Sequence, residues 1–302
     1  MSSVLYDVPG PRARLRNRLI GILTIVVVLA ILAWVLWRFA ATGQFSADKW
    51  EIFGFTRIWM LIGGGVLNTL AAFGAAAVGA LILGFLLAIG RLSDHAWVRV
   101  PIAWIVEVLR AVPVLILMML LYYGLPVVGL RMPPYWAVVI ALIVYNGAVL
   151  AEVLRAGIES LPTGQREAGY AVGLRKSGVM RLVLLPQAVR AMMPVIIAQL
   201  VVTLKDTALG FIITYPELLY VIKLLGSNAV FHSPLIPTAI VGGSIYVALC
   251  LALSYVAFVV EKRMRRSSKT GGRVARADAV TTDTELIVAQ RGAGKFDGGG
   301  AA

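Results

Sequence analysis

The chain has 302 residues, of which 60% are apolar and 14% are charged, and its mean hydropathy is +0.87. Soluble domains are about half apolar and about a quarter charged, so this composition excludes an ordinary soluble domain. The net charge of +13 would suit a nucleic-acid-binding protein, unless the basic residues have another reason to be there. One cysteine and two distant histidines exclude a disulfide framework and offer no metal-ligand spacing.

Six stretches are apolar enough to cross a bilayer as helices, which takes about 20 residues each. They are residues 19–37, 63–89, 101–123, 135–154, 189–213 and 237–260. The sequence therefore predicts an all-α integral membrane protein with six transmembrane helices. The first stretch is longer than the apolar part of a signal peptide and no clear cleavage site follows it, so we expect it to be an uncleaved span.

The basic residues outside these stretches predict how the chain is oriented. Lysine and arginine number 21 on the side that holds both tails and the second-to-third and fourth-to-fifth connections, against five on the other side. Cytoplasmic segments carry such an excess of positive charge. Both termini and the central loop are therefore expected in the cytoplasm, in a multi-pass protein of the cytoplasmic membrane. The charge follows from topology, and no nucleic-acid partner is predicted.

These expectations divide the chain into four parts. Residues 1–18 form a basic cytoplasmic tail, and residues 19–62 form the first transmembrane helix with an external loop. Residues 63–260 form a core of five helices with a cytoplasmic loop at 156–188. Residues 261–302 form a basic tail that becomes rich in glycine and alanine, a composition that predicts disorder.

The second predicted helix carries small residues at every fourth position, which places them on one face. They are Ala72, Ala76, Ala80, Gly84 and Ala88. Lipid removes the hydrophobic force between helices, so membrane helices associate where small residues let their backbones approach closely. This face is therefore expected to make a tight helix–helix contact within the bundle.

Four charged residues fall inside predicted spans, where charges are costly and often functional. Glu107 and Arg110 lie three residues apart in the third span, and Lys205 and Asp206 are adjacent in the fifth. Glu107 and Arg110 can pair along one helix face. Two interpretations stay open: the charges hold helices together, or they line a polar path for a substrate.

The central loop is predicted to contain a helix of about nine residues. Thr163 is a possible N-cap, and Gly173 is well placed to end the helix. Between them, Ala168, Ala171 and Val172 form a small apolar face. A helix this short is not stable alone, so it is expected to dock on a partner.

The same loop carries a resemblance to a known family. Glu167-Ala168-Gly169, Gly173, Val183 and Leu185-Pro186 resemble the EAA loop of binding-protein-dependent ABC transporter permeases. That pattern is E-A-A, three residues, G, nine residues, an aliphatic residue, any residue and L-P, and every spacing fits. Gly169 replaces the third small residue, and Val183 replaces isoleucine. The blocks at 104–126, 147–168, 185–194 and 204–209 resemble the polar amino acid branch, and the likeness spans about residues 63–260.

The resemblance implies an ABC importer of type I fold and names its partners. A second permease subunit, ABC ATPase subunits and an extracytoplasmic substrate-binding protein are implied, with a polar amino acid of the glutamate, glutamine or basic class as the substrate. The chain itself is then not an enzyme and binds no cofactor, with ATP and Mg²⁺ on the ATPase subunits and lipid around the helices. The ATPase-coupling residues would be Gly164, Arg166, Glu167, Ala168, Gly169, Gly173, Leu185 and Pro186.

Other functional classes have less support from the sequence. An ion-coupled secondary amino acid transporter is the main alternative, but its paired halves and broken helices are not evident. A channel needs a filter-like loop, and an enzyme needs a clustered nucleophile and base or a metal set; neither pattern is found. The sequence does not identify which amino acid is carried, or whether the two permease subunits are identical.

Overall fold

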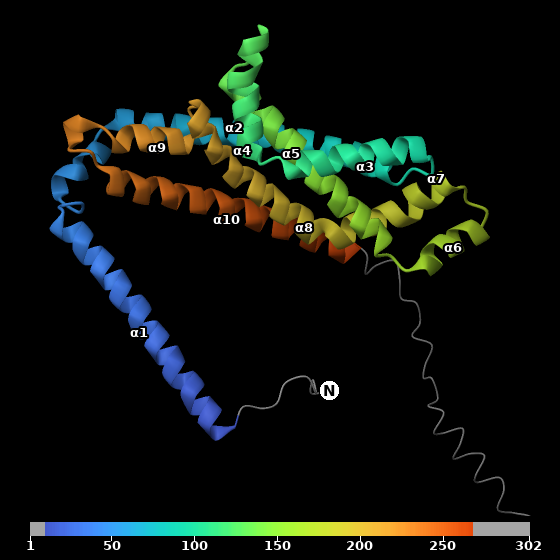
Figure 1. The fold of residues 1–302 in the computed structure, drawn as a ribbon, viewed down its shortest axis with the longest axis horizontal. Helices are drawn as coiled ribbons and strands as arrows, with labels where there is room; N and C mark the ends of the chain where they lie inside the picture. Colours follow the sequence, from blue (N-terminus) through green and yellow to red (C-terminus); the bar gives the residue numbers. More distant parts are fainter. Residues whose placement is uncertain (1–9, 268–302) are drawn as a thin grey trace, which may run out of the picture.

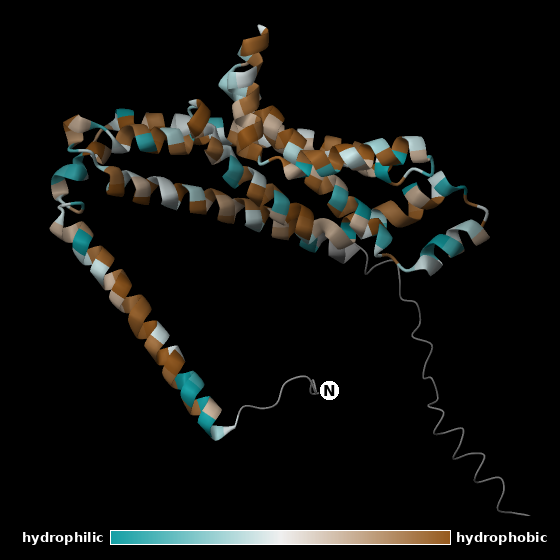
Figure 2. Cartoon of the chain, viewed as in Figure 1, coloured by the Kyte–Doolittle hydropathy of each residue, from teal (hydrophilic) through white to brown (hydrophobic). Residues whose placement is uncertain are grey.

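The computed structural model describes residues 10–267, and every regular element in this range is helical (Figure 1). Five helices are long and apolar enough to cross a membrane, or six if one bent pair counts as a single span. Apolar residues run along all of these helices (Figure 2). This confirms the all-α membrane fold. The predicted disorder of the C-terminal tail concerns residues that lie mostly outside the described range.

The elements follow one another in a simple order. The long helices are α1 (Pro11–Ala41), α2 (Thr56–Arg91), α3 (Ala96–Ala111), α5 (Pro134–Glu159), α8 (Leu185–Asp206) and α10 (Leu235–Ser267). The short α-helices are α4 (Val114–Met119), α6 (Thr163–Ala171), α7 (Lys176–Gly178) and α9 (Leu218–Gly226). The 3-10 and π segments are η1 (Ala47–Lys49), η2 (Glu51–Gly54), η3 (Leu120–Gly124), η4 (Leu125–Val128), η5 (Val179–Leu184), η6 (Thr207–Ile213) and η7 (Ala229–Phe231).

Helix α1 stands apart from the other helices (Figure 1) and buries none of its residues. It begins at Pro11, a residue whose fixed φ suits the first helical position. The arginines at 12, 14, 16 and 18, which were expected in a tail, therefore lie in its first turns.

The small-residue face of α2 is buried against α5, as its spacing predicted. Ala72, Ala76 and Ala80 are fully buried, and α2 and α5 make the most extensive helix–helix contact in residues 10–267. A Cβ placed on Gly84 would lie 2.8 Å from the Leu150 Cβ and 3.0 Å from the Gly147 carbonyl oxygen. The two backbones therefore approach closely at Gly84, where no larger residue fits.

The third predicted span, 101–123, is not one helix. The chain bends by 93° between α3 and the segment Val114–Val128. The cause is Pro113, because the residue before a proline is driven out of the helical region, and Val112 has the extended angles φ −82° and ψ 121°. The segment from α4 to η4 consequently projects away from the bundle (Figure 1).

Two helical turns widen into π-helix, and each is followed directly by a Leu-Pro pair. Segment η3 precedes Leu125-Pro126, and segment η5 precedes Leu185-Pro186. In an α-helix a proline ring clashes with the carbonyl four residues earlier and donates no hydrogen bond. A wider turn relieves that clash, so we attribute both π segments to these prolines.

Helix α9 was not predicted, because its nine residues are too few to span a membrane. It packs on α2 and α10 through an apolar cluster that includes Ile62, Leu218 and Ile222. Glu217 caps its start: the carboxylate accepts hydrogen bonds from the backbone N–H groups of Leu219 (2.8 Å) and Tyr220 (2.7 Å). The same carboxylate accepts a hydrogen bond from the Tyr246 hydroxyl at 3.0 Å, which ties α9 to α10.

We predict that Gly84→Leu destabilises the bundle by about 1–3 kcal/mol, because the added side chain overlaps backbone atoms that cannot rotate away. Thermal unfolding of the purified protein in detergent, followed by intrinsic fluorescence, measures the change. Gly74→Leu on the same helix is the matched control, since a Cβ there meets nothing within 4 Å. Equal melting temperatures for the two variants would contradict the close approach of α2 and α5.

Candidate functional site

The nine residues of α6 form the predicted helix of the central loop, with one correction at its start. The N-cap is Pro162, and Thr163 is already the first helical residue without a side-chain capping bond. Proline's fixed φ places the turn into the helix one residue earlier than a threonine cap would. The predicted N-cap at Thr163 is therefore wrong, while the predicted length is confirmed.

The end of α6 is a complete Schellman cap. Gly173 has a left-handed φ of +82°, and its N–H donates to the Tyr170 carbonyl at 2.9 Å. The Leu174 N–H donates to the Gly169 carbonyl at 3.2 Å. This pair of bonds satisfies carbonyls that the helix end leaves open, and glycine adopts the left-handed conformation without strain. Gly173 ends the helix as predicted.

One face of α6 docks on the π segment η5. Gly169 is buried, and a Cβ there would lie 2.8 Å from Val179 Cγ2. Val179 belongs to a buried cluster with Ile158, Leu184 and Ala188. The short helix is thus fixed on the continuous helical segment that leads into α8. Within this chain the contact is made by Gly169, and the apolar face of Ala168, Ala171 and Val172 stays exposed.

The opposite face of α6 is exposed and made of small residues around one acid. Gly164, Glu167, Ala168 and Ala171 follow the i, i+3, i+4, i+7 pattern of one helix stripe, and all four are exposed. Val172 is also exposed, at 76%. Because three of these four side chains are small, the α6 backbone can pack closely in a groove of another protein.

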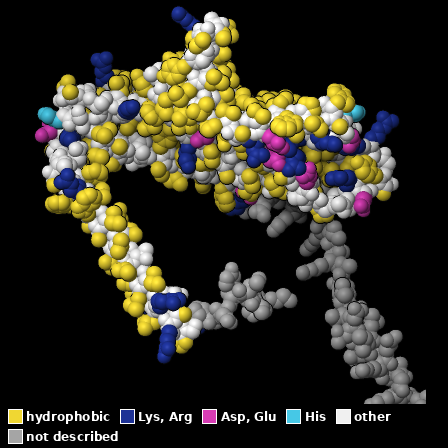
Figure 3. Space-filling model, viewed as in Figure 1, with side chains coloured by type: hydrophobic (Ala, Val, Ile, Leu, Met, Phe, Trp, Pro, Cys, Tyr) yellow, Lys and Arg dark blue, Asp and Glu magenta, His cyan; other side chains and the backbone are white. Residues whose placement is uncertain are grey.

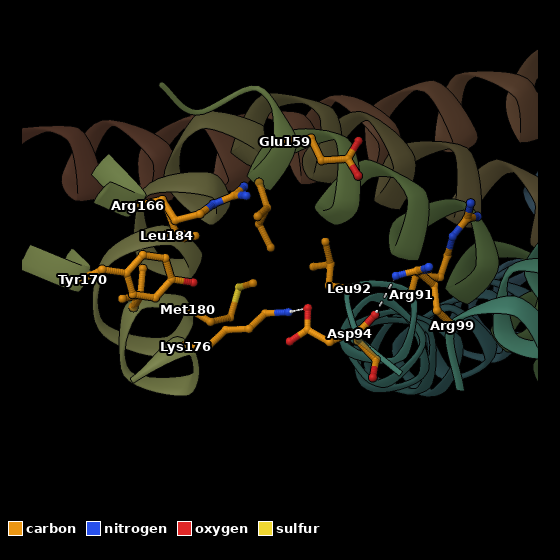
Figure 4. A pocket seen from close by; sticks show the side chains of 13 residues that line it. Arg91, Leu92, Asp94, Arg99, Glu159, Arg166, Tyr170, Lys176, Met180 and Leu184 are labelled. Atoms are coloured by element: carbon orange, nitrogen blue, oxygen red, sulfur yellow. Dashed lines mark hydrogen bonds and ion pairs between the residues drawn. The ribbon is translucent and has the colours of Figure 1, made fainter. Parts of the chain in front are cut away.

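Next to α6 lies a cavity of about 500 Å³ between the ends of α2, α3 and α5 (Figure 4). Arg166 and Tyr170 line it from α6, while Arg91 and Arg99 line it from α2 and α3 (Figure 4). Lys176 extends across it and pairs with Asp94. This hydrogen bond from Lys176 is the main cause that lowers the pKa of the Asp94 carboxyl, which stays ionised at neutral pH.

A chain of ion pairs lies at this end of the bundle, on α2 and α5. Arg91 Nη1 lies 2.8 Å from Glu152 Oε2, and Arg155 Nη2 lies 2.6 Å from Glu152 Oε1. Arg155 also pairs with Glu159. Charged side chains of both signs gather over this end in the space-filling view, and the middle of the bundle is largely apolar (Figure 3). The Arg91–Glu152 pair links the end of α2 to α5, and the two Arg155 pairs lie within the last turns of α5.

The four charges that were predicted inside the membrane do not form one cluster. Glu107 and Arg110 are exposed on α3, and Lys205 is exposed near the end of α8 with Asp206 half-buried beside it. In residues 10–267 no ion pair or side-chain hydrogen bond is found for any of the four. The local pairing considered for Glu107 and Arg110 is absent, and an ion pair between two exposed side chains would gain little free energy in water.

Two polar contacts between helices were missed by the sequence reasoning. Gln199 on α8 donates to Asn146 on α5 at 2.7 Å, and the fully buried Asn146 amide donates to the Leu142 carbonyl. Glu217 is also fully buried. The sequence does contain signals for both contacts. Asn146 and Gln199 are each the single amide in an apolar span, and Glu217 directly precedes the apolar run that forms α9. The Asn146 and Gln199 amides are uncharged, so the charge pattern of the spans does not indicate this contact.

Comparison with known proteins identifies the family. Residues 80–266 match the family described as binding-protein-dependent transport system inner membrane component. The chain belongs to this family. It is thus a multi-pass component of a transport system in the cytoplasmic membrane, and the resemblance read from the central loop is confirmed.

Curated relatives cover most of the same region. The glutamate transport system permease protein GluD of Corynebacterium glutamicum is 37% identical over 230 residues, which cover 75% of this chain and 83% of the relative. The arginine transport system permease protein ArtQ of Bacillus subtilis is 31% identical over 206 residues, covering 67% of this chain and 91% of ArtQ. The glutamine transport system permease protein GlnP of Escherichia coli is 32% identical over 191 residues, covering 62% and 85%.

Solved structures share the fold. The crystal structure of an amino acid ABC transporter with histidines superposes with a TM-score of 0.64 at 27% identity, over 70% of this chain and 98% of the other. An inward-facing MetNI methionine ABC transporter gives a TM-score of 0.58 at 20% identity, over 70% and 99%, and supports the fold alone. The predicted ABC importer permease fold is confirmed.

We predict that Gly173→Ala loosens the end of α6, because a Cβ in the left-handed region costs about 1–2 kcal/mol. Hydrogen–deuterium exchange of the Gly173 and Leu174 amides should become at least about fivefold faster. Gly164→Ala is the control: Gly164 lies inside the helix with nothing within 4 Å, so alanine should leave exchange unchanged or slow it. Unchanged exchange in Gly173→Ala would contradict the role of the cap.

Proposed function

We propose that this chain is the permease subunit of an ATP-driven importer for a polar amino acid of the glutamate, glutamine or basic class. Membership of the family carries the transport function. The substrate class rests on the names of three relatives, which are permeases for glutamate, arginine and glutamine. The sequence blocks that resemble the polar amino acid branch agree with it.

We propose further that α6 couples the membrane helices to an ABC ATPase subunit in the cytoplasm. The observation that supports this role is that one face of α6 packs on this chain and the opposite face is exposed. Gly169 fixes the helix on η5, while Gly164, Glu167 and Ala168 remain exposed for a partner. Arg166 lines the neighbouring cavity. Gly173, Leu185 and Pro186 shape the helix end and the return into α8.

ATP and Mg²⁺ belong to the partner in this proposal. Transport needs a two-state equilibrium, and ATP can shift that equilibrium only through a surface whose contacts differ between the states. A helix that is anchored on one side and open on the other can transmit such a shift. The permease chain then supplies the path, and the ATPase subunits supply the hydrolysis. An extracytoplasmic binding protein delivers the amino acid, in keeping with the family description.

A second permease subunit is also part of the proposal. The segment from α4 to η4 projects from the bundle (Figure 1). Met118 near its base is fully buried, but apolar side chains farther along are exposed, with Leu120 at 61% and Val127 at 85%. An apolar arm that leaves the bundle at an angle is suited to pack on a neighbouring permease. The proposal covers either a second copy of this chain or a similar one.

We predict that Glu167→Lys lowers ATP-dependent uptake at least tenfold, because the long cation reverses the charge and adds bulk on the exposed stripe of α6. Uptake is measured in vesicles that contain the co-expressed transporter, with the amount of inserted permease checked by immunoblot. Asp48→Lys makes the same charge change on the exposed segment η1, far along the chain from α6, and should transport normally. Uptake that an ion gradient drives without any ATPase subunit would instead support the secondary transporter.

We predict that Arg110→Ala and Lys205→Ala each reduce uptake if the intramembrane charges line the substrate path. Arg110 can bind the carboxylate of an amino acid, and Glu107 or Asp206 its ammonium group. Neither cation has an ion-pair partner within residues 10–267, so alanine should cost little stability. Uptake and substrate-stimulated ATPase activity of the assembled complex are the measurements. Normal transport by both variants would refute the polar path.

A further inference from the structure

Two cavities meet at the end of the bundle near α6, and their chemistry differs. The first is the cavity of about 500 Å³ already described, which four basic side chains line: Arg91, Arg99, Arg166 and Lys176. The second has a volume of about 720 Å³ and a mostly apolar lining. Leu92, Ser93, Asp94, Ile158, Lys176 and Met180 line both, so the cavities adjoin.

The two cavities are ordered along the helices. On α2 the apolar cavity is lined by Phe85, Ala88 and Ile89, and the basic cavity by Arg91 at the end of the helix. On α5, Leu154 lines the apolar cavity only, and Glu159 at the helix end lines the basic cavity only. With a rise of 1.5 Å per residue, the apolar cavity reaches about 9 Å from the basic end toward the middle of the spans.

The side chains that line the basic cavity carry a net positive charge. Its lining holds four cations and two carboxylates, Asp94 and Glu159. Asp94 is engaged by Lys176, and Glu159 is engaged by Arg155, which lies outside the lining. Arg91 Nη1 lies 2.8 Å from Glu152, a carboxylate outside the lining, so Arg91 is also paired. Arg99 and Arg166 are the two lining cations without an ion-pair partner in residues 10–267. Arg99 donates one hydrogen bond of 3.3 Å to the Ser93 carbonyl.

The apolar cavity is lined in part by residues of the predicted membrane span 63–89. Phe85 and Ile89 line it and are 38% and 52% exposed on the surface of α2, a helix long enough to span the membrane. We therefore expect lipid beside these two side chains, where an acyl chain can reach the cavity. A soluble phosphate would use the basic cavity only, and an uncharged apolar molecule would use the other cavity only.

We propose that these adjoining cavities bind one anionic phospholipid, with its headgroup phosphate among Arg91, Arg99, Arg166 and Lys176 and an acyl chain beside Phe85 and Ile89. Basic pockets between membrane helices suit anionic headgroups, and the positive-inside count assigns this end to the leaflet that carries them. The bound headgroup bridges α6 to the ends of α2 and α3.

The test is native mass spectrometry of the full-length chain, purified with its co-expressed partners from nanodiscs of equal phosphatidylglycerol and phosphatidylcholine. We expect one phosphatidylglycerol per chain, retained at least tenfold over phosphatidylcholine. Arg99→Gln should weaken this retention about fivefold, and Arg99→Gln with Lys176→Gln about 25-fold. Arg99→Lys keeps the charge and should retain the lipid.

Arg175→Gln is the matched control, because Arg175 is an exposed arginine at the same end that lines neither cavity. The proposal is overturned by equal retention of the two lipids, or by an equal loss in Arg175→Gln and Arg99→Gln. It is also overturned if millimolar glycerol 3-phosphate displaces the lipid completely, since the basic cavity would then be a site for a soluble phosphate.

Melting temperatures of all variants separate lost binding from lost folding. If Arg99→Gln unfolds, Lys176→Gln alone tests the headgroup site.

Discussion

The close approach of α2 and α5 is the contact on which the rest of the bundle depends. Two apolar helices in lipid gain little from hydrophobic burial, and their association rests on packing over a long shared surface. Ala72, Ala76 and Ala80 provide that surface, and Gly84 allows backbone contact with Gly147. The pair then fixes the ends of both helices, where Arg91 meets Glu152. The central loop leaves α5 a few residues later, so its position follows from this packing.

Much of this arrangement could be predicted from the sequence because it rests on local rules. The spacing of four in α2, the length of α6 and the glycine that ends it each follow from helix geometry. Family motifs added the fold, and the comparison with relatives confirmed it. The division of the chain into four parts, the orientation of the termini and the roles of the loop residues stay predictions. They concern the membrane and partner proteins, whose contacts a single chain does not contain.

The features that could not be predicted depend on contacts distant in sequence. Hydropathy treats 101–123 as one apolar run, although the backbone restriction before Pro113 divides it. Helix α9 is too short for a hydropathy window and is held by Glu217 and Tyr246, 29 residues apart. Asn146 and Gln199 each look like a single tolerated polar residue, and only the fold shows that they face each other. Thr163 fits a cap as well as Pro162 does, so the start of α6 was placed one residue late.

The π segment before Leu185-Pro186 also has a consequence for the rest of α8. A π turn holds one more residue than the α-helical turn it replaces, and one residue corresponds to about 100° of rotation around the axis. Pro186 therefore sets the angular phase of the whole helix relative to α6. If the extra residue were absent and the sequence of α8 stayed the same, Gln199 would point about a quarter turn or more away from Asn146. The Leu-Pro pair of the family pattern thus determines how α8 is rotated about its axis relative to α6, and so which of its residues face α5.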